Sequence, residues 1–405
     1  MQKNNIVNYL LAINAILRSY ALLGINLDKL IYMLMSFCFV KEVTRSMNRI
    51  YVLIPWLWLS IYCLIIVPLL TVALFSLKFS MPVFVAILFI VLSTIYNHGK
   101  LDVFIKIYRF FVLFSCFYFF FQEFTYNTTG IRISGLIPFL DNIYTSKSNI
   151  TTSVIISKLS TYNRSASLFL EPAHFVQFIS PFLIISLFSD KYKSIRDAII
   201  ITIVLIMSRS GNGLFLLGII YTNYFFRTSK NRWVKYLILG VLIVPLFYFS
   251  NTIEGQLIFQ RTAELDTNID EVNSGFIRIY RGFYIWDEQS YMQKLFGVGD
   301  NLNYSMSQAL KYQWMFRGNN DMFFNGIQNL LLSYGLIGLT LFLFAMYRLY
   351  KCTNTVGKVS LLAFVGLCFI ESIYNTTIMI LYVGIAILYL NDKYAKTTNY
   401  PCTIL

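Results

Sequence analysis

An acid and a histidine three residues apart mark the segment Arg164-Ser-Ala-Ser-Leu-Phe-Leu-Glu171-Pro172-Ala-His174-Phe175. Pro172 suits the first turn of a helix, because the N–H group that it lacks would have no partner there. Glu171 then stands at the start of the helix, where the dipole favours a carboxylate, and His174 lies over the same face. The segment therefore predicts a carboxylate and an imidazole held together as a general base. A helix cap followed by an interfacial histidine is the alternative interpretation.

A second set of candidate functional residues lies in the run Met207-Ser-Arg209-Ser-Gly211-Asn-Gly213. This run interrupts a nearly continuous apolar stretch from 199 to 226. An arginine at membrane depth is unfavourable and by default functional. Its planar guanidinium suits bidentate binding of phosphate. The glycines permit a tight turn between two short spans. The alternative interpretation is an arginine that reaches the interface from a hairpin.

Two further arginines, Arg278 and Arg281, lie in the long polar segment Asn251–Asn325. The stretch Gly275–Tyr291 has helical spacing with aromatic residues on one face, and arginines three residues apart on a helix share a face. Together with Arg209 they would clamp a diphosphate without a metal ion. The alternative interpretation is a solvated loop face.

Other polar residues stand where predicted spans begin or end. Asn325 precedes the tenth span, in which Gly335 and Gly338 predict close helix packing. Glu371 and Asn375 lie at a hairpin between two short spans. Lining a site and capping a helix both remain open for Glu371.

The elements that must position these residues are apolar helices. The chain has 405 residues, of which 57% are hydrophobic and 13% charged, far outside the range of soluble globular proteins. Windows of about 19 residues predict an all-α polytopic membrane protein with twelve transmembrane helices. They lie at Ile6–Leu23, Leu27–Val40, Ile50–Leu74, Met81–Asn97, Asp102–Phe124, Pro172–Ser189, Arg196–Ser208, Asn212–Arg227, Trp233–Ser250, Gly326–Leu349, Val359–Ser372 and Thr376–Leu390. The first run holds Arg18 and lacks a small-residue cleavage site, so it predicts a retained span rather than a signal peptide.

The distribution of charge predicts the orientation of the chain. With both termini in the cytoplasm, the inner segments hold 19 of the 33 Lys and Arg residues and 5 of the 19 acids, so the net charge of +14 lies on that face. This is the positive-inside bias, and it requires no nucleic acid as a partner. The chain is then a single integral membrane domain, 1–405, with a first periplasmic loop at 125–170. A large periplasmic loop at 251–325 separates the ninth and tenth spans.

Cysteines and histidines are few and scattered. None of the six cysteines falls in a predicted outer loop, and no CxxC spacing occurs, so we expect no disulfide framework. The two histidines, His98 and His174, form no Cys/His cluster, so we expect no zinc site.

Taken in order, these motifs resemble those of the O-antigen polymerase and ligase superfamily, the Wzy-like glycosyltransferases of bacterial surface polysaccharide assembly. Ser208-Arg-Ser210 resembles the Ser-Arg-Ser/Gly turn of that superfamily. Arg278, nineteen residues before the Gly-Val-Gly at 297–299, resembles its loop arginine and following glycine turn. The Asn325 segment and its two later glycines resemble the approach to the next span. The number of spans and the large late loop are similar as well.

Two details resemble polymerases more than ligases. Glu171-Pro-Ala-His-Phe175 resembles the Glu-Pro-x-x-Phe element of polymerases. Ligases typically carry a histidine immediately before the asparagine of the late-loop motif, and this chain has Phe324 there.

The resemblance implies a GT-C-like, metal-independent glycosyltransferase of the bacterial inner membrane, with its active site facing the periplasm. The donor would be a glycan on undecaprenyl diphosphate and the acceptor one lipid-linked repeat unit, with no cofactor. Arg209 and Arg278 would bind the diphosphate with Arg281 or Arg164 assisting, while Glu171 and His174 would orient or deprotonate the acceptor. Aromatic residues of the long loop would stack on sugars. A chain-length regulator and a flippase are the expected protein partners.

Three alternatives remain open from the sequence. The first is an O-antigen ligase, which shares the same frame. The second is a flippase or transporter of the lipid-linked oligosaccharide, although its charges should line a central passage. The third is a structural membrane protein.

Overall fold

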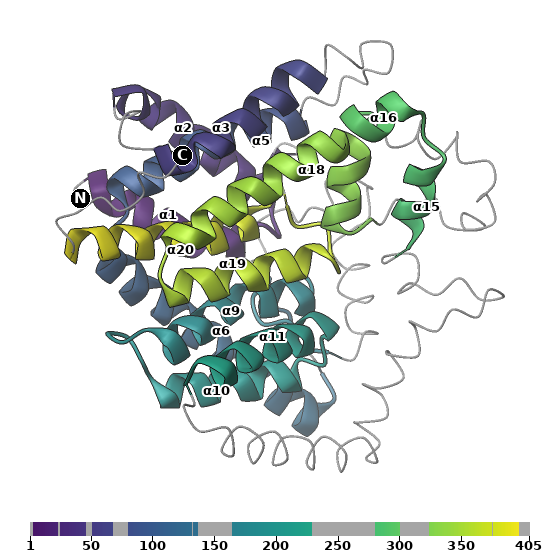
Figure 1. Cartoon of the computed structure of the whole chain (residues 1–405). Helices are drawn as coiled ribbons and strands as arrows, with labels where there is room; N and C mark the ends of the chain where they lie inside the picture. Colours follow the sequence, from purple (N-terminus) through teal and green to yellow (C-terminus); the bar gives the residue numbers. More distant parts are fainter. Residues whose placement is uncertain are drawn as a thin grey trace.

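The computed structural model describes residues 3–22, 25–45, 51–67, 80–131, 133–136, 164–228, 280–299, 324–374 and 376–396. This part of the chain is predominantly helical (Figure 1). A hairpin of two short strands, Ala21–Leu22 (β1) and Ile25–Asn26 (β2), joins the first two helices. The α-helices are Lys3–Leu17 (α1), Leu27–Arg45 (α2), Ile54–Ile61 (α3), Ser80–His98 (α5), Leu101–Thr129 (α6), Pro172–Phe188 (α9), Ile195–Met207 (α10), Gly211–Thr228 (α11), Arg281–Asp287 (α15), Tyr291–Phe296 (α16), Gly326–Cys352 (α18), Thr355–Cys368 (α19) and Thr377–Lys396 (α20). A 3-10 turn, Tyr51–Leu53 (η2), precedes α3, and a π-helical turn, Tyr62–Ile66 (η3), follows it.

Two of the described helices are long and apolar enough to cross a bilayer. α6 has 29 residues with a mean hydropathy of 1.8 in its most apolar stretch, and α18 has 27 residues with 2.0. At about 1.5 Å per residue, either helix exceeds the roughly 30 Å of a hydrocarbon core. Shorter apolar helices, among them α9, α19 and α20, accompany them. This set of helices is consistent with an all-α membrane protein.

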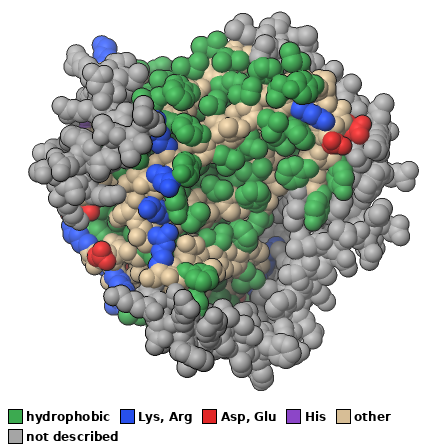
Figure 2. All heavy atoms as spheres, viewed as in Figure 1, with side chains coloured by type: hydrophobic (Ala, Val, Ile, Leu, Met, Phe, Trp, Pro, Cys, Tyr) green, Lys and Arg blue, Asp and Glu red, His purple; other side chains and the backbone are tan. Residues whose placement is uncertain are grey.

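Exposed apolar side chains form stripes on the outside of the bundle. On α6, Phe110, Phe114, Phe117, Phe121 and Phe124 are all exposed, at a spacing that places them along one helix face. Figure 2 shows hydrophobic side chains over most of one face of the molecule, bordered on one side by a line of Lys and Arg side chains. An apolar surface of this extent marks contact with a membrane or a partner.

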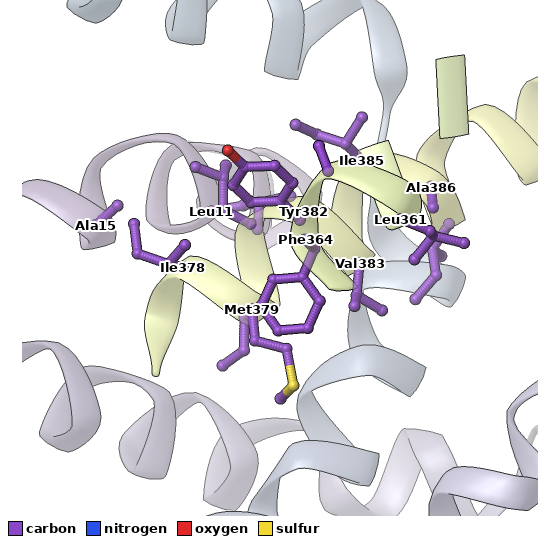
Figure 3. Packing of buried hydrophobic residues seen from close by; sticks show 14 of the residues in the cluster. Leu11, Ala15, Leu361, Phe364, Ile378, Met379, Tyr382, Val383, Ile385 and Ala386 are labelled. Carbon is purple, nitrogen blue, oxygen red and sulfur yellow. The ribbon is translucent and has the colours of Figure 1, made fainter. Parts of the chain in front are cut away.

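α20 is the central helix of the bundle. Every residue from Thr377 to Leu390 is buried, because α1, α5, α9, α18 and α19 pack around it (Figure 1). Figure 3 shows Tyr382 of α20 beside Leu11 of α1, and Phe364 of α19 beside Met379. A helix that is apolar all round is buried rather than amphipathic. α20 therefore holds the surrounding helices at fixed positions.

Helices lie at eleven of the twelve spans predicted from the sequence, and the ninth, Trp233–Ser250, falls outside the described residues. Some bounds differ from the prediction. α19 begins at Thr355 rather than at Val359, because the Asn354 side chain accepts a hydrogen bond from Gly357 N at 3.1 Å and caps the helix earlier. α6 continues to Thr129, into the segment expected to be loop.

Candidate functional site

A buried, non-helical segment, residues 164–171, leads the chain into α9. Ser167 has a positive φ of 53° and is held from three directions by α6. Its N–H donates to Gln122 Oε1 at 2.8 Å, its hydroxyl donates to Ser115 O at 2.6 Å, and its carbonyl accepts from Gln122 Nε2 at 3.2 Å. Non-helical backbone inside an apolar bundle requires such partners. The segment is thereby fixed at the start of α9.

α9 begins as the sequence predicts. Pro172 lies in the first turn and Glu171 is the N-cap residue in an extended conformation, and no hydrogen bond from its side chain caps the helix. His174 and Gln177 follow at the spacing that places them on one face of α9. The carboxylate beside His174 comes from a distant part of the chain: Glu371 Oε1, in the turn between α19 and α20, lies 3.7 Å from His174 Nε2.

Glu371 is the centre of a polar group that we call the carboxylate cluster, made up of Arg18, His174, Gln177, Asn212 and Glu371. Glu371 Oε2 accepts a hydrogen bond from Gln177 Nε2 at 2.5 Å and another from Asn212 Nδ2 at 2.5 Å. Arg18 Nη1 donates to Gln177 Oε1 at 3.3 Å. The cluster joins α9, α11, the α19–α20 turn and the residue that follows α1. These donors stabilise the carboxylate, and Arg18 adds a positive charge next to them.

The cluster lies at one end of the bundle, which we call the cluster end. α9, α11, α18 and α20 begin at this end, while α1, α10 and α19 finish there. The opposite end holds the short connections between α5 and α6, α9 and α10, and α18 and α19. Ion pairs lie at that opposite end, between Lys191 and Asp102 at 2.7 Å and between Arg109 and Asp197 at 2.8 Å.

Arg209 lies at the cluster end, in the turn between α10 and α11. Its φ is 51°, so the left-handed residue of the turn is the arginine itself and not Gly211, which begins α11. Gly213 serves close packing instead, since a Cβ there would lie 3.1 Å from Leu205 O. The Arg209 side chain is exposed, and Arg164 Nη1 donates to Arg209 O at 3.3 Å. The structure thus places the Arg164 side chain beside the backbone of Arg209.

Of the two arginines expected in the long loop, the structure describes Arg281, whose environment differs from the solvated loop face considered from the sequence. Arg278 lies outside the described residues. α15 begins at Arg281, with Tyr280 as its N-cap. Arg281 is fully buried, with Cζ 5.0 Å from the centre of the Phe324 ring. Burial lowers the pKa of Arg281 to about 10. The solvated-face interpretation is therefore wrong for Arg281.

The glycine turn after α16 interlocks with a break in α18. Gly335 has φ 65° and ψ −171°, which interrupts the helix and leaves backbone carbonyls of the preceding turn without their usual partners. Val298 N donates to Leu332 O at 3.0 Å, and Gly299 N donates to Ser333 O at 2.9 Å. The sequence predicted close packing at Gly335, and the packing partner is the loop backbone: a Cβ on Gly335 would lie 2.2 Å from Leu295 O.

The start of α18 fixes the end of the long loop against the cluster. Asn325 caps the helix by accepting a hydrogen bond from Gln328 N at 2.8 Å. Gly326 N donates to Glu371 O at 3.0 Å, and Asn329 Nδ2 donates to Ser372 Oγ at 2.5 Å. The Asn325 motif therefore acts structurally, and it sets the position of the turn that carries Glu371. Asn375, which the sequence places beside Glu371 at this hairpin, lies outside the described residues.

Exposed aromatic side chains stand on α15 and α16 and beside them. Tyr280, Phe283, Tyr284 and Tyr291 are all exposed. α15 packs on the first turns of α18, because Gly282 lies so close to Gln328 that a Cβ would meet its side chain at 2.6 Å. The aromatic surface is thereby held near the cluster end.

Sequence reasoning missed the central role of Glu371 and the participation of Gln177, Asn212 and Arg18. Arg18 carried the clearest signal, since an arginine in an apolar span is by default functional. Gln177 and Asn212 carried no such signal, because nothing in the neighbouring sequence distinguishes these two amides from residues on a helix surface. Among the described residues, no group of three or more His, Cys, Asp or Glu side chains could hold a metal ion.

Comparison with models of protein families and with curated protein sequences finds no match to this chain.

Proposed function

We propose that this protein is a surface polysaccharide (O-antigen) polymerase of the bacterial inner membrane. It joins oligosaccharide repeat units carried on undecaprenyl diphosphate at the periplasmic face and releases undecaprenyl diphosphate. The observation that carries this proposal is the carboxylate cluster at the same end of the bundle as Arg164 and the exposed Arg209. Glu371 Oε2 receives two hydrogen bonds of 2.5 Å there, and Arg164 donates to the Arg209 carbonyl at 3.3 Å.

The arginines supply what the leaving group requires. When the anomeric bond breaks, negative charge grows on the diphosphate, and fixed guanidinium groups stabilise it. Arg209 is exposed on a short turn, so it can reach a phosphate at the membrane surface. Arg278 joins it in this proposal, with Arg164 assisting. Arg281 is buried against Phe324, and in this proposal it stabilises the loop.

The cluster end also suits a large, lipid-linked acceptor. The exposed aromatic residues Tyr280, Phe283, Tyr284 and Tyr291 offer faces on which sugar rings stack. The exposed apolar stripes on the helices would face lipid, so the isoprenoid chains can stay in the bilayer beside them. In this arrangement Glu171 and His174, at the first turn of α9, orient the acceptor unit.

The charge pattern supports a periplasmic position for the cluster. Basic side chains gather at the opposite end, where Lys100, Lys191, Arg227, Lys351 and Lys358 stand at helix ends or connections. The positive-inside rule assigns such an end to the cytoplasm. The cluster and the loop that ends at Asn325 then face the periplasm.

The surface lipopolysaccharide of a strain lacking only this protein tests the proposal. We expect lipid A–core capped with one repeat unit, because flipping and ligation continue while polymerisation stops. Bare core with long lipid-linked polymer would indicate a ligase instead. Bare core with unpolymerised lipid-linked units would indicate a flippase. Either of these results, or an unchanged ladder, contradicts an O-antigen polymerase.

A further inference from the structure

We infer that Glu371 is the catalytic base that takes the proton of the acceptor hydroxyl, held for this task by Gln177 and Asn212. The inference rests on the proposed polymerase function and deepens it. It replaces a base formed by Glu171 and His174, which lie together in sequence, with a carboxylate supplied by the other end of the chain.

The two oxygens of Glu371 have different surroundings. Oε2 accepts both amide hydrogen bonds, each of 2.5 Å, from Gln177 and Asn212. Oε1 faces His174 Nε2 at 3.7 Å and, within the described part of the chain, accepts no hydrogen bond. The Glu371 side chain keeps 23% of its surface exposed, so a hydroxyl group can approach Oε1. One oxygen is thus fixed by the protein and the other is available to a substrate.

The amide groups are oriented by a third residue. Arg18 Nη1 donates to Gln177 Oε1 at 3.3 Å, so the carbonyl side of the amide faces Arg18 and the amino side faces Glu371. Gln177 is fully buried, and its backbone carbonyl accepts a hydrogen bond from Tyr382 OH at 3.2 Å. The donors to Oε2 are therefore in place before any substrate binds, as electrostatic preorganisation requires.

Glu371 is the better base of the cluster on structural grounds. His174 Nδ1 is buried and has no hydrogen-bond partner among the described residues. A protonated imidazole would carry an N–H at that position, and burying an unsatisfied donor is unfavourable. Neutral His174 can instead orient Oε1 through Nε2. When the Glu371 carboxylate takes up a proton instead, no new buried donor is left without a partner.

The position of Glu371 places the base beside the leaving-group site. Asn212, which holds Oε2, comes three residues after Arg209 on the same turn and helix. Gly326 N donates to Glu371 O at 3.0 Å, which ties the base to the end of the long loop. The backbone at Gly326 packs tightly against this turn, because a Cβ there would lie 3.1 Å from Cys368 Cβ and 3.2 Å from Glu371 O.

The step balances as a single displacement. The acceptor hydroxyl oxygen forms a bond to the anomeric carbon of the donor. The bond from that carbon to the diphosphate oxygen breaks, and its electron pair leaves with undecaprenyl diphosphate. The hydroxyl proton passes to Glu371 Oε1, which later releases it to water at the exposed edge of the side chain.

The test is chain extension by the purified full-length protein in lipid vesicles, with undecaprenyl-diphosphate-linked repeat units as both donor and acceptor. We expect Glu371→Gln to lower the extension rate about 100-fold or more at an unchanged KM, because a positioned base contributes about 10²–10⁴-fold. Glu123→Gln, the same chemical change at the cluster end of α6, is the matched control and should keep the wild-type rate. Glu371→Gly supplies a second measurement, since added formate should restore part of its activity.

The outcomes separate this inference from the proposed function. If the wild-type protein extends chains and Glu371→Gln does so at the same rate, Glu371 is not the base, while the proposed polymerase function still holds. A loss of extension in Glu371→Gly that formate does not relieve overturns the base assignment as well, because a purely structural role gives that result. A wild-type protein that extends no chain overturns both.

Discussion

At the scale of single residues, Arg209 combines an unusual backbone conformation with a side chain that we propose binds diphosphate. It adopts φ 51° in a two-helix turn, a conformation that is unfavourable by about 1 kcal/mol or more for a residue other than glycine. Gly211 is only two positions away, so the turn does not lack glycines. An exposed arginine at this strained position fits the proposal that its guanidinium binds the diphosphate.

Arg209→Gly separates the two roles of this residue. The glycine adopts the same φ without strain, so we expect equal or slightly higher thermal stability in detergent. We expect chain extension to fall about 100-fold or more, as on removal of a charge-stabilising donor. Arg209→Lys should restore little, because an ammonium group lacks the bidentate fork. Wild-type extension by Arg209→Gly would remove Arg209 from the diphosphate site.

Arg278 makes an independent prediction, although it lies outside the described residues. We expect Arg278→Ala to abolish chain extension while the amount of protein in the membrane stays the same. Arg278→Lys should rescue poorly for the same geometric reason as at Arg209. The measurement is the polymer ladder together with immunoblotting of membranes. Normal polymer from both variants would show that no arginine clamp operates at this position.

At the scale of elements, the break in α18 and the turn at 297–299 form one unit. The freed carbonyls of Leu332 and Ser333 accept hydrogen bonds from Val298 and Gly299, and Tyr62 OH donates to Tyr334 O at 2.9 Å. The loop is thereby anchored inside the bundle rather than on its surface. Anchoring at this point positions α15, α16 and their exposed aromatic residues.

Gly335→Ala tests the interlock. A Cβ would lie 2.2 Å from Leu295 O and would have to adopt φ 65°, ψ −171°, so we expect a loss of about 2 kcal/mol or more of stability. Gly218→Ala, at an exposed position of α11, is the matched control, because its Cβ meets nothing within 4 Å. That variant should be stabilised by about 0.5–1 kcal/mol. Thermal unfolding in detergent measures both, and equal melting temperatures would contradict the interlock.

The sequence predicts the elements well and their long-range contacts poorly. Apolar runs locate eleven helices, and Pro172 locates the start of α9, because both signals are local. The carboxylate cluster escapes prediction, since Glu371 is separated by 194 residues from Gln177 and by 159 from Asn212. Local spacing paired His174 with Glu171 for the same reason. The helix break at Gly335 was missed because its partner, the 297–299 turn, precedes α18 by a long segment of chain.

At the scale of the whole molecule, the basic helix ends and connections that the structure describes lie at the end of the bundle opposite the carboxylate cluster. The described basic connections, such as those at Lys100 and Lys191, stand away from the carboxylate cluster. This separation predicts the orientation directly. A fluorescent protein fused to the C-terminus should fold and fluoresce in the cytoplasm, and alkaline phosphatase inserted near residue 268 should be active in the periplasm. The reverse pair of results would place the cluster on the cytoplasmic face and contradict the proposed function.

The most direct measurement is chain extension by the purified wild-type protein in vesicles supplied only with undecaprenyl-diphosphate-linked repeat units. No nucleotide sugar, metal ion or second enzyme is added, and the chelator EDTA is present throughout. We predict a ladder of lipid-linked polymer, with one undecaprenyl diphosphate released for each unit joined. Repeat units that stay single under these conditions, with correctly folded protein in the vesicles, would contradict the assignment of this chain as a polymerase.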